Sequence, residues 1–250
     1  MFGAILCNIM NSQDVRVGYR IGKLALNMVN QNDAFISELP FVYFVYYGQI
    51  ATIFEPIQAC LDQHTKAYEL GMQLGKASIS ALHKQLLRVR ELYAGGKNLL
   101  ELKEEIDIDM KMAKHDLLPI LGMKSQLCYQ AVSNLIDGKL TTSKDIDPAG
   151  LYDPEGAYIL SRVITLTFLG YFERAKHLVD DDGLKRSTGL KKSIPMFHAC
   201  YIYFFYGISS IGLCRRKKLK HLPKNLKKIS DVLENAGGFS EWNFRNKASL

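Results

Sequence analysis

The sequence predicts an all-α fold, an α-solenoid-like stack of about eight or nine helices paired as hairpins. Apolar residues recur at spacings of three and four along most of the chain, which is typical of helices. The 250 residues include only 7 prolines, and strand signals are poor throughout. In residues 169–175 (LGYFERA), a glycine ends one helix, and an alanine five positions later allows the next helix to approach closely.

The segment 169–175 is similar to the corner of a tetratricopeptide-type (TPR-like) helical repeat. We therefore expect structural roles at this corner for Gly170, Tyr171 and Ala175. A looser copy of the pattern contains Gly71 and Gly75. These residues shape a turn between helices and carry no reactive chemistry.

The first part of the chain predicts six helices. Residues 14–30 place Val17, Ile21, Leu24 and Met28 on one helical face. Residues 37–54 form an aromatic helix that is uncharged after position 38, which indicates burial on most sides. Residues 57–72 and 76–94 form a hairpin that ends at a Gly-Gly pair. Residues 99–116 and 117–136 follow, with a kink predicted at Pro119.

The domain organisation is predicted from the loop at residues 139–153, which is rich in Ser, Thr, Asp, Pro and Gly. It separates a helical sub-bundle at 1–138 from a second one at 154–250. The second contains the hairpin at 154–179, an aromatic helix at 194–214 and a basic amphipathic helix at 220–236. It stops where a further helix would begin, so we expect it to be truncated at its C-terminus.

Positive charge is concentrated in the C-terminal third. No acidic residue lies between Asp182 and Asp231, an interval with twelve lysines and arginines, whereas the rest of the chain carries a net charge of −5. This pattern indicates either a solvated surface, a contact for an acidic protein, or a module that binds nucleic acid or an anionic membrane. Lysine outnumbers arginine and residues 215–228 contain no Phe, Tyr or Trp, which does not favour nucleic acid. The candidate interaction residues are Arg215, Arg216, Lys217, Lys218 and Lys220.

Residues 197–214 raise the question of a membrane span. They contain no Asp, Glu, Lys or Arg, and a basic run follows. The segment is nevertheless short and carries a histidine, serines and tyrosines, which favours a buried helix of a water-soluble protein over a membrane-associated one. The five cysteines are scattered and form no CxxC pair, which is typical of a reducing, cytoplasmic setting.

No residues are predicted to be catalytic, metal-binding or cofactor-binding. The six histidines lack metal-ligand spacing, and the Asp run at 180–182 lacks the pattern of a calcium loop. Glu105 and Asp109 share one helical face, where we expect an exposed charged surface rather than an acid–base pair. The aromatic residues at 41–47 and 201–206 are expected to pack between hairpins.

Several of these segments together resemble one family. It is the TPR-like helical region that follows the AAA-type ATPase module in large signalling proteins with serine/threonine kinase or sensor histidine kinase domains. The matching segments are 47–48, 67–75, 93–100, 129–135, 169–175, 204–206 and 242–244. The resemblance implies a non-catalytic scaffold for protein–protein interaction or signal transduction, whose partner is another protein or a neighbouring domain of the same polypeptide. A Walker A motif is lacking, so the resemblance transfers no catalytic residue.

Overall fold

The computed structural model describes residues 15–94, 96–115, 119–140, 157–179, 196–218, 226–227 and 229–231. All regular structure in these residues is helical, which confirms the predicted all-α class. The main elements in these residues are ten α-helices, and two of them, α3 and α4, are parts of one continuous rod. None of the described helices has the length and apolar character needed to cross a membrane.

The chain begins with α2 (Val15–Asn30) and the 3₁₀-helix η1 (Asp33–Glu38). The aromatic segment predicted as one helix follows as α3 (Leu39–Val45), the π-helix η2 (Tyr46–Ile50) and α4 (Ala51–Phe54). A π-helix contains one extra residue per turn, and neither composition nor periodicity indicated it. The rod is nevertheless buried over much of its length, as its lack of charge predicted.

The next four helices form two antiparallel pairs. α5 (Ile57–Gln73) packs on α6 (Ala77–Tyr93), and α7 (Leu99–His115) packs on α8 (Pro119–Asp137). Pro119 stands at the start of α8, where its fixed φ and missing N–H are tolerated, rather than at a kink inside a helix. The boundaries of α5, α6 and α7 lie within a residue of those that periodicity predicted.

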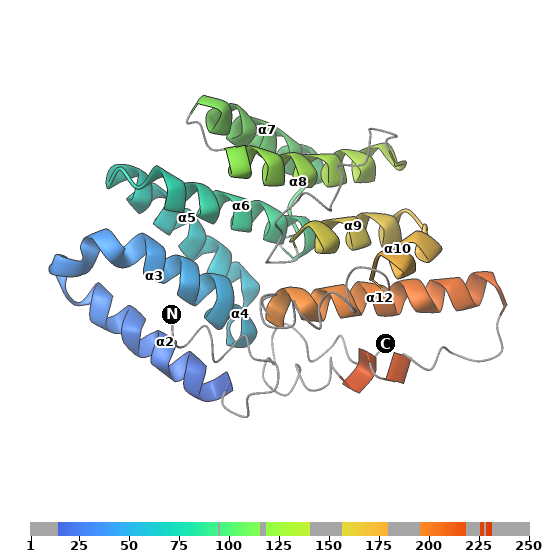
Figure 1. The fold of residues 1–250 in the computed structure, drawn as a ribbon, viewed down its shortest axis with the longest axis horizontal. Coiled ribbons are helices and arrows are strands. Elements are labelled where there is room, and N and C mark those ends of the chain that lie inside the picture. Colours follow the sequence, from blue (N-terminus) through green and yellow to red (C-terminus); the bar gives the residue numbers. More distant parts are fainter. Residues whose placement is uncertain are drawn as a thin grey trace.

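The chain then turns back along the stack (Figure 1). α9 (Ala157–Phe168) packs on α8 and on α10 (Phe172–Leu178), and α12 (Met196–Arg216) packs on both α9 and α10. Helical residues at 226–227 and 229–231 fall within the predicted basic helix, and Ile229 is buried. The rest of that predicted helix lies outside the described residues.

One apolar cluster joins the early and late helices. It includes Leu26 and Tyr46 from the beginning of the chain and Leu160, Cys200 and Phe205 from α9 and α12. The aromatic helix α12 therefore packs in the protein core. Residues 141–153 of the predicted inter-domain loop lie outside the described part, and the division into two sub-bundles stays a prediction.

Candidate interaction site at the α9–α10 corner

The structure has a helical corner between α9 and α10 at Gly170, as the sequence predicted. Gly170 has a φ of 76°, a left-handed conformation that glycine adopts without a steric penalty. The Tyr171 N–H donates to the Leu166 carbonyl at 2.8 Å, and the Gly170 N–H donates to the Thr167 carbonyl at 3.1 Å. This pair of bonds is a Schellman motif, which ends a helix and satisfies its last carbonyls.

The corner between α5 and α6 has the same geometry 95 residues earlier. Gly75 has a φ of 69°, the Lys76 N–H donates to the Gly71 carbonyl at 2.8 Å, and the Gly75 N–H donates to the Met72 carbonyl at 3.1 Å. The looser sequence copy therefore forms an equally regular Schellman motif.

Small residues allow the helices to approach at both corners. Ala175, five residues after Gly170, is fully buried in α10. The corresponding residue after Gly75 is Ser80, which is also fully buried. A Cβ atom built on Gly71 would lie 2.2 Å from Ser80 Oγ, so the two helices meet at this glycine.

The aromatic residue that packs beneath the α9–α10 corner is Phe172. Its ring lies so close to α12 that a Cβ atom built on Gly212 would be 2.7 Å from Phe172 Cε2. Tyr171, to which the sequence assigned a structural role here, is 41% exposed. The structure thus leaves the Tyr171 side chain on the surface of the corner.

The basic end of α12 lies against the same corner. A hydrogen bond of 2.7 Å between Thr167 Oγ1 and Ser209 Oγ joins α9 to α12 further along. At the end of α12, Arg216 Nη1 donates to the Gly170 carbonyl at 3.3 Å. A cation at this position also complements the negative C-terminal end of α9. Two groups of residues that the sequence singled out separately are therefore in contact.

One acidic residue of α10 contacts this basic end. Lys217 Nζ lies 2.6 Å from Glu173 Oε1, and this pairing lowers the pKa of Glu173. Arg215 and Lys218 are exposed, and within the described part of the chain their side chains make no ion pair. Lys220, the fifth predicted interaction residue, lies outside the described residues.

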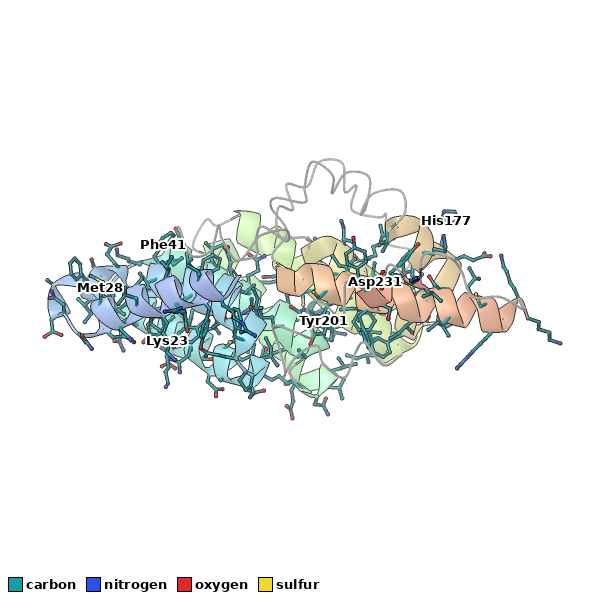
Figure 2. The ribbon with its side chains drawn as sticks, turned by 90° about the horizontal axis from the view of Figure 1, so that it is seen from below. Lys23, Met28, Phe41, His177, Tyr201 and Asp231 are labelled. Carbon is teal, nitrogen blue, oxygen red and sulfur yellow. The ribbon has the colours of Figure 1, made fainter. Side chains whose placement is uncertain are left out.

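Two exposed aromatic rings complete the surface. Phe168 at the end of α9 is 68% exposed and rests on Phe205 of α12, with ring centroids 5.8 Å apart. In Figure 2, His177 of α10 lies toward the same end of the molecule as this corner. We call the surface formed by the two exposed rings and the four exposed cations the corner patch; its members are Phe168, Tyr171, Arg215, Arg216, Lys217 and Lys218.

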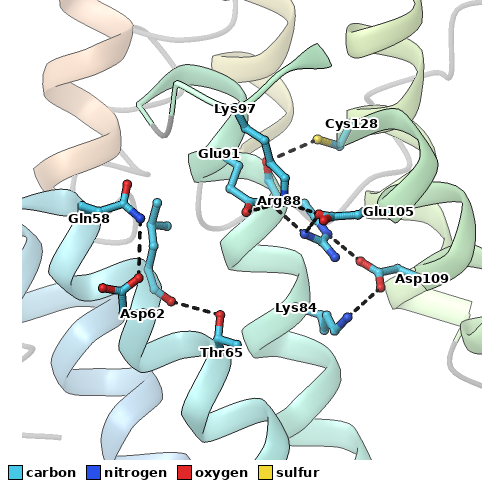
Figure 3. A network of polar contacts seen from close by, with 11 residues as sticks. Gln58, Asp62, Thr65, Lys84, Arg88, Glu91, Lys97, Glu105, Asp109 and Cys128 are labelled. Carbon is cyan, nitrogen blue, oxygen red and sulfur yellow. Dashed lines mark hydrogen bonds and ion pairs between the residues drawn. The ribbon is translucent and has the colours of Figure 1, made fainter. Parts of the chain in front are cut away.

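The two carboxylates considered for acid–base work lie elsewhere, between α6 and α7 (Figure 3). Arg88 Nε donates to Asp109 Oδ2 at 2.7 Å, and Arg88 also pairs with Glu105 and Glu91. Lys84 pairs with Asp109 at 3.1 Å. Asp109 is 5% exposed, so the expectation of an exposed charged surface is wrong for this residue.

This ion-pair network binds two helices together. Burial lowers the pKa of Arg88, but its carboxylate partners outweigh that effect and the net result is a raised pKa. Lys97 extends the network to Glu91 and Glu105, at 3.1 Å and 2.5 Å. The charged residues of both helices can be read from the sequence, but their pairing depends on how α6 and α7 pack against each other.

A second buried polar group went unnoticed in the sequence. His64 Nδ1 of α5 lies 2.8 Å from His83 Nδ1 of α6, and His83 Nε2 lies 2.8 Å from the Pro40 carbonyl of α3. Arg90 Nη1 lies 2.9 Å from His64 Nε2, and the same guanidinium donates to the carbonyls of Tyr47 and Gly48 in η2. Both imidazoles and the guanidinium are fully buried.

Burial changes the acid–base behaviour of these histidines. It lowers the pKa of His64 well below its ordinary value, and the nearby Arg90 charge lowers it further. Burial also lowers the pKa of His83 to about 4, despite the opposing bond to the Pro40 carbonyl. Among the described residues, no group of three or more His, Cys, Asp or Glu side chains could hold a metal ion; the Asp run at 180–182 lies outside them.

Comparison with protein-family models, with curated proteins and with solved structures finds no match to this chain.

Proposed function

We propose that this protein is a non-catalytic helical scaffold that binds an acidic segment of another protein through the corner patch. The observation that carries the proposal is the contact between the basic end of α12 and the α9–α10 corner, made by Arg216 and the Gly170 carbonyl. This contact brings the basic end of α12 to the turn whose flanking residues are the exposed Phe168 and Tyr171.

Charge and exposed apolar area together favour a protein partner. Phe168 exposes more than half of its surface, and exposed aromatic residues next to arginine are typical of protein interfaces. Arg215 and Lys218 have no ion-pair partner within the described residues, so their charges are available to carboxylates. Phosphate binding alone would use the cations but would leave the two rings without a role.

The resemblance to the helical region of ATPase–kinase signalling proteins adds a proposal about context. In that setting, the partner would be a neighbouring domain or a signalling protein in the cytoplasm. Reading the coding sequence on both sides of this chain tests it, because a nucleotide-binding module upstream and a kinase module downstream are expected.

A direct binding experiment tests the corner patch. The probe is a fluorescent peptide in which phenylalanines alternate with runs of Asp and Glu, and the readout is fluorescence anisotropy with the full chain. We expect binding that weakens as salt rises and that falls about tenfold in the Arg215→Glu/Lys218→Glu variant. Phe168→Ser is expected to weaken binding without changing its salt dependence.

The matched control reverses two exposed lysines elsewhere, Lys66→Glu on α5 and Lys111→Glu on α7. It changes the net charge equally and is expected to retain most of the affinity. Equal losses in both double variants would reduce the effect to net charge and refute the proposal. Preferential binding of duplex RNA or of phosphatidylserine vesicles would replace it with the nucleic-acid or membrane alternative.

A further inference from the structure

The helix α2 exposes an apolar stripe. Of the thirteen large hydrophobic side chains that are exposed in the described residues, seven lie between positions 17 and 41. On α2, Leu24 and Met28 are 61% and 60% exposed, and Val17 and Ile21 are 40% and 37% exposed. These are the four residues that the periodicity placed on one helical face. A concentration of this kind is typical of an interaction surface.

The opposite face of α2 holds the helix in place. A Cβ atom built on Gly22 would lie 2.7 Å from Ile50 Cδ1, and Leu26 is buried in the core. The hydroxyls of Tyr19 and Tyr46 both donate to Glu55 Oε1, at 2.8 Å and 2.9 Å. The helix cannot rotate its stripe inward without breaking these contacts. Figure 2 views the molecule from the side on which α2 lies.

The spacing of the exposed residues identifies the kind of partner. Val17, Ile21, Leu24 and Met28 are separated by four, three and four residues, which are the a and d positions of a heptad repeat. Such a seam is narrow and fits the ridge of one other helix. A helix that lies on a membrane surface has a broader apolar face, so the spacing favours a helical protein partner.

The charges beside the stripe identify the partner's chemistry. α2 contains Arg16, Arg20 and Lys23 and no acidic residue, and all three cations are exposed. They occupy one edge of the apolar stripe, since the helical rotation of about 100° per residue places them between the stripe and the buried face. A second copy of this chain would bring a further three positive charges to the same contact. Carboxylates on a partner helix would instead pair with them.

We propose that α2 is a docking surface for an acidic amphipathic helix of a partner protein, which lays its own apolar a and d residues along Val17, Ile21, Leu24 and Met28. The surface is separate from the corner patch and does not depend on the function proposed for it.

The probe is a synthetic three-heptad peptide with leucine at the a and d positions and glutamate at the flanking ones, and a version with lysine at the flanking positions serves for comparison. Binding to the full chain is measured by fluorescence anisotropy, and peptide helicity by circular dichroism. We expect the glutamate peptide to bind at least about tenfold more tightly than the lysine peptide. The Arg16→Glu/Arg20→Glu variant is expected to reverse this preference.

The apolar stripe is tested by Leu24→Asn/Met28→Asn, which is expected to lower the affinity for the glutamate peptide about tenfold or more. Met72→Asn/Ile108→Asn removes comparable exposed side chains on α5 and α7 and is expected to leave the affinity unchanged. The corner variant Arg215→Glu/Lys218→Glu should also bind this peptide normally, which separates the two proposals.

Three results would overturn this inference. The first is absence of binding, or binding that Leu24→Asn/Met28→Asn leaves intact. The second is a concentration-dependent dimer in sedimentation experiments that the same variant abolishes, which would assign the stripe to a second copy. The third is partition onto anionic vesicles that requires Leu24 and Met28, which would assign it to a membrane surface.

Discussion

His64 and His83 face each other across the α5–α6 interface with their Nδ1 atoms 2.8 Å apart, and their neighbours fix the tautomer of both rings. The Pro40 carbonyl can only accept, so His83 Nε2 carries a hydrogen. The Arg90 guanidinium can only donate, so His64 Nε2 carries none. His64 Nδ1–H therefore donates to His83 Nδ1. Both imidazoles are neutral. A proton added to either ring would remove the nitrogen that accepts a bond in this series of hydrogen bonds.

This arrangement predicts that the protein loses stability in mild acid. The pKa of His83 is about 4 in the folded protein and near 6.5 when unfolded, so the unfolded state takes up protons more readily. The stability that depends on neutral His83 is fully present above about pH 6.5, and it is lost as the pH falls from there toward 4. For His83 alone we expect a loss of about 2 kcal/mol between pH 8 and pH 5 in urea unfolding experiments.

His83→Gln is the control for the acid effect. The glutamine amide can donate to the Pro40 carbonyl, but it does not titrate in this range. The variant is expected to be less stable at pH 8 and to lose less of its stability between pH 8 and pH 5. An unchanged loss over that range would show that other groups cause the acid sensitivity.

The guanidinium of Arg90 is expected to be irreplaceable by lysine. Its planar fork reaches His64 and the carbonyls of Tyr47 and Gly48 at once, whereas an ammonium is a point charge on a flexible stem. Arg90→Lys should lower the free energy of unfolding by about 3 kcal/mol, because it leaves buried acceptors without donors. The exposed Arg20→Lys exchange should change it by less than about 0.5 kcal/mol. Similar values for both variants, in chemical denaturation, would contradict this account.

Two aspartates on α7, one buried and one exposed, are expected to contribute very differently to stability. Asp109→Asn removes a buried charge that Arg88 and Lys84 share, and should destabilise the protein by about 3 kcal/mol. Asp107→Asn breaks an exposed pair with Lys111 on the same helix and should cost about 0.5 kcal/mol or less. Thermal unfolding of both variants measures the difference, and equal effects would place Asp109 outside the core.

The close contact between α5 and α6 predicts a rescue. Gly71→Ala places a methyl group against Ser80 Oγ and should cost about 2 kcal/mol. Adding Ser80→Ala removes the obstructing oxygen, so the double variant should be more stable than Gly71→Ala alone. Gly75→Ala has open space around it and should cost about 1 kcal/mol through its left-handed backbone. If the double variant is no more stable than Gly71→Ala alone, the contact with Ser80 Oγ is not what makes Gly71→Ala destabilising.

The helical hairpins were predicted well from the spacing of apolar residues and from the residues that begin and end helices. The glycines at 75 and 170 specify a backbone conformation directly, so their corners could be predicted from local sequence. The boundaries of α5, α6 and α7 followed for the same reason, because the signals that begin and end a helix are local.

The orientation of α2 could not be predicted in this way. The largest hydrophobic residues of a helix normally mark its buried face. On α2 they are exposed, and the buried face consists instead of Gly18, Gly22 and Leu26. Close approach at Gly22 depends on the partner Ile50, which lies in a π-helix without a sequence signature. The corner patch likewise needed the return of α12 to α9, a long-range contact that no local pattern contains.

In Figure 1, α2 lies toward the left and the basic end of α12 toward the right, so the two surfaces lie toward opposite ends of the longest axis of the molecule. Between them, the Arg90 guanidinium fixes α6 to the rod of α3 and α4, so sliding of one helix past another would break several buried bonds at once. If both proposed surfaces bind their partners, the protein would act as a spacer of nearly constant length. Two ligands bound at its ends would be held at a constant distance, and a ligand pair joined by a linker of matching span would gain affinity through effective concentration alone.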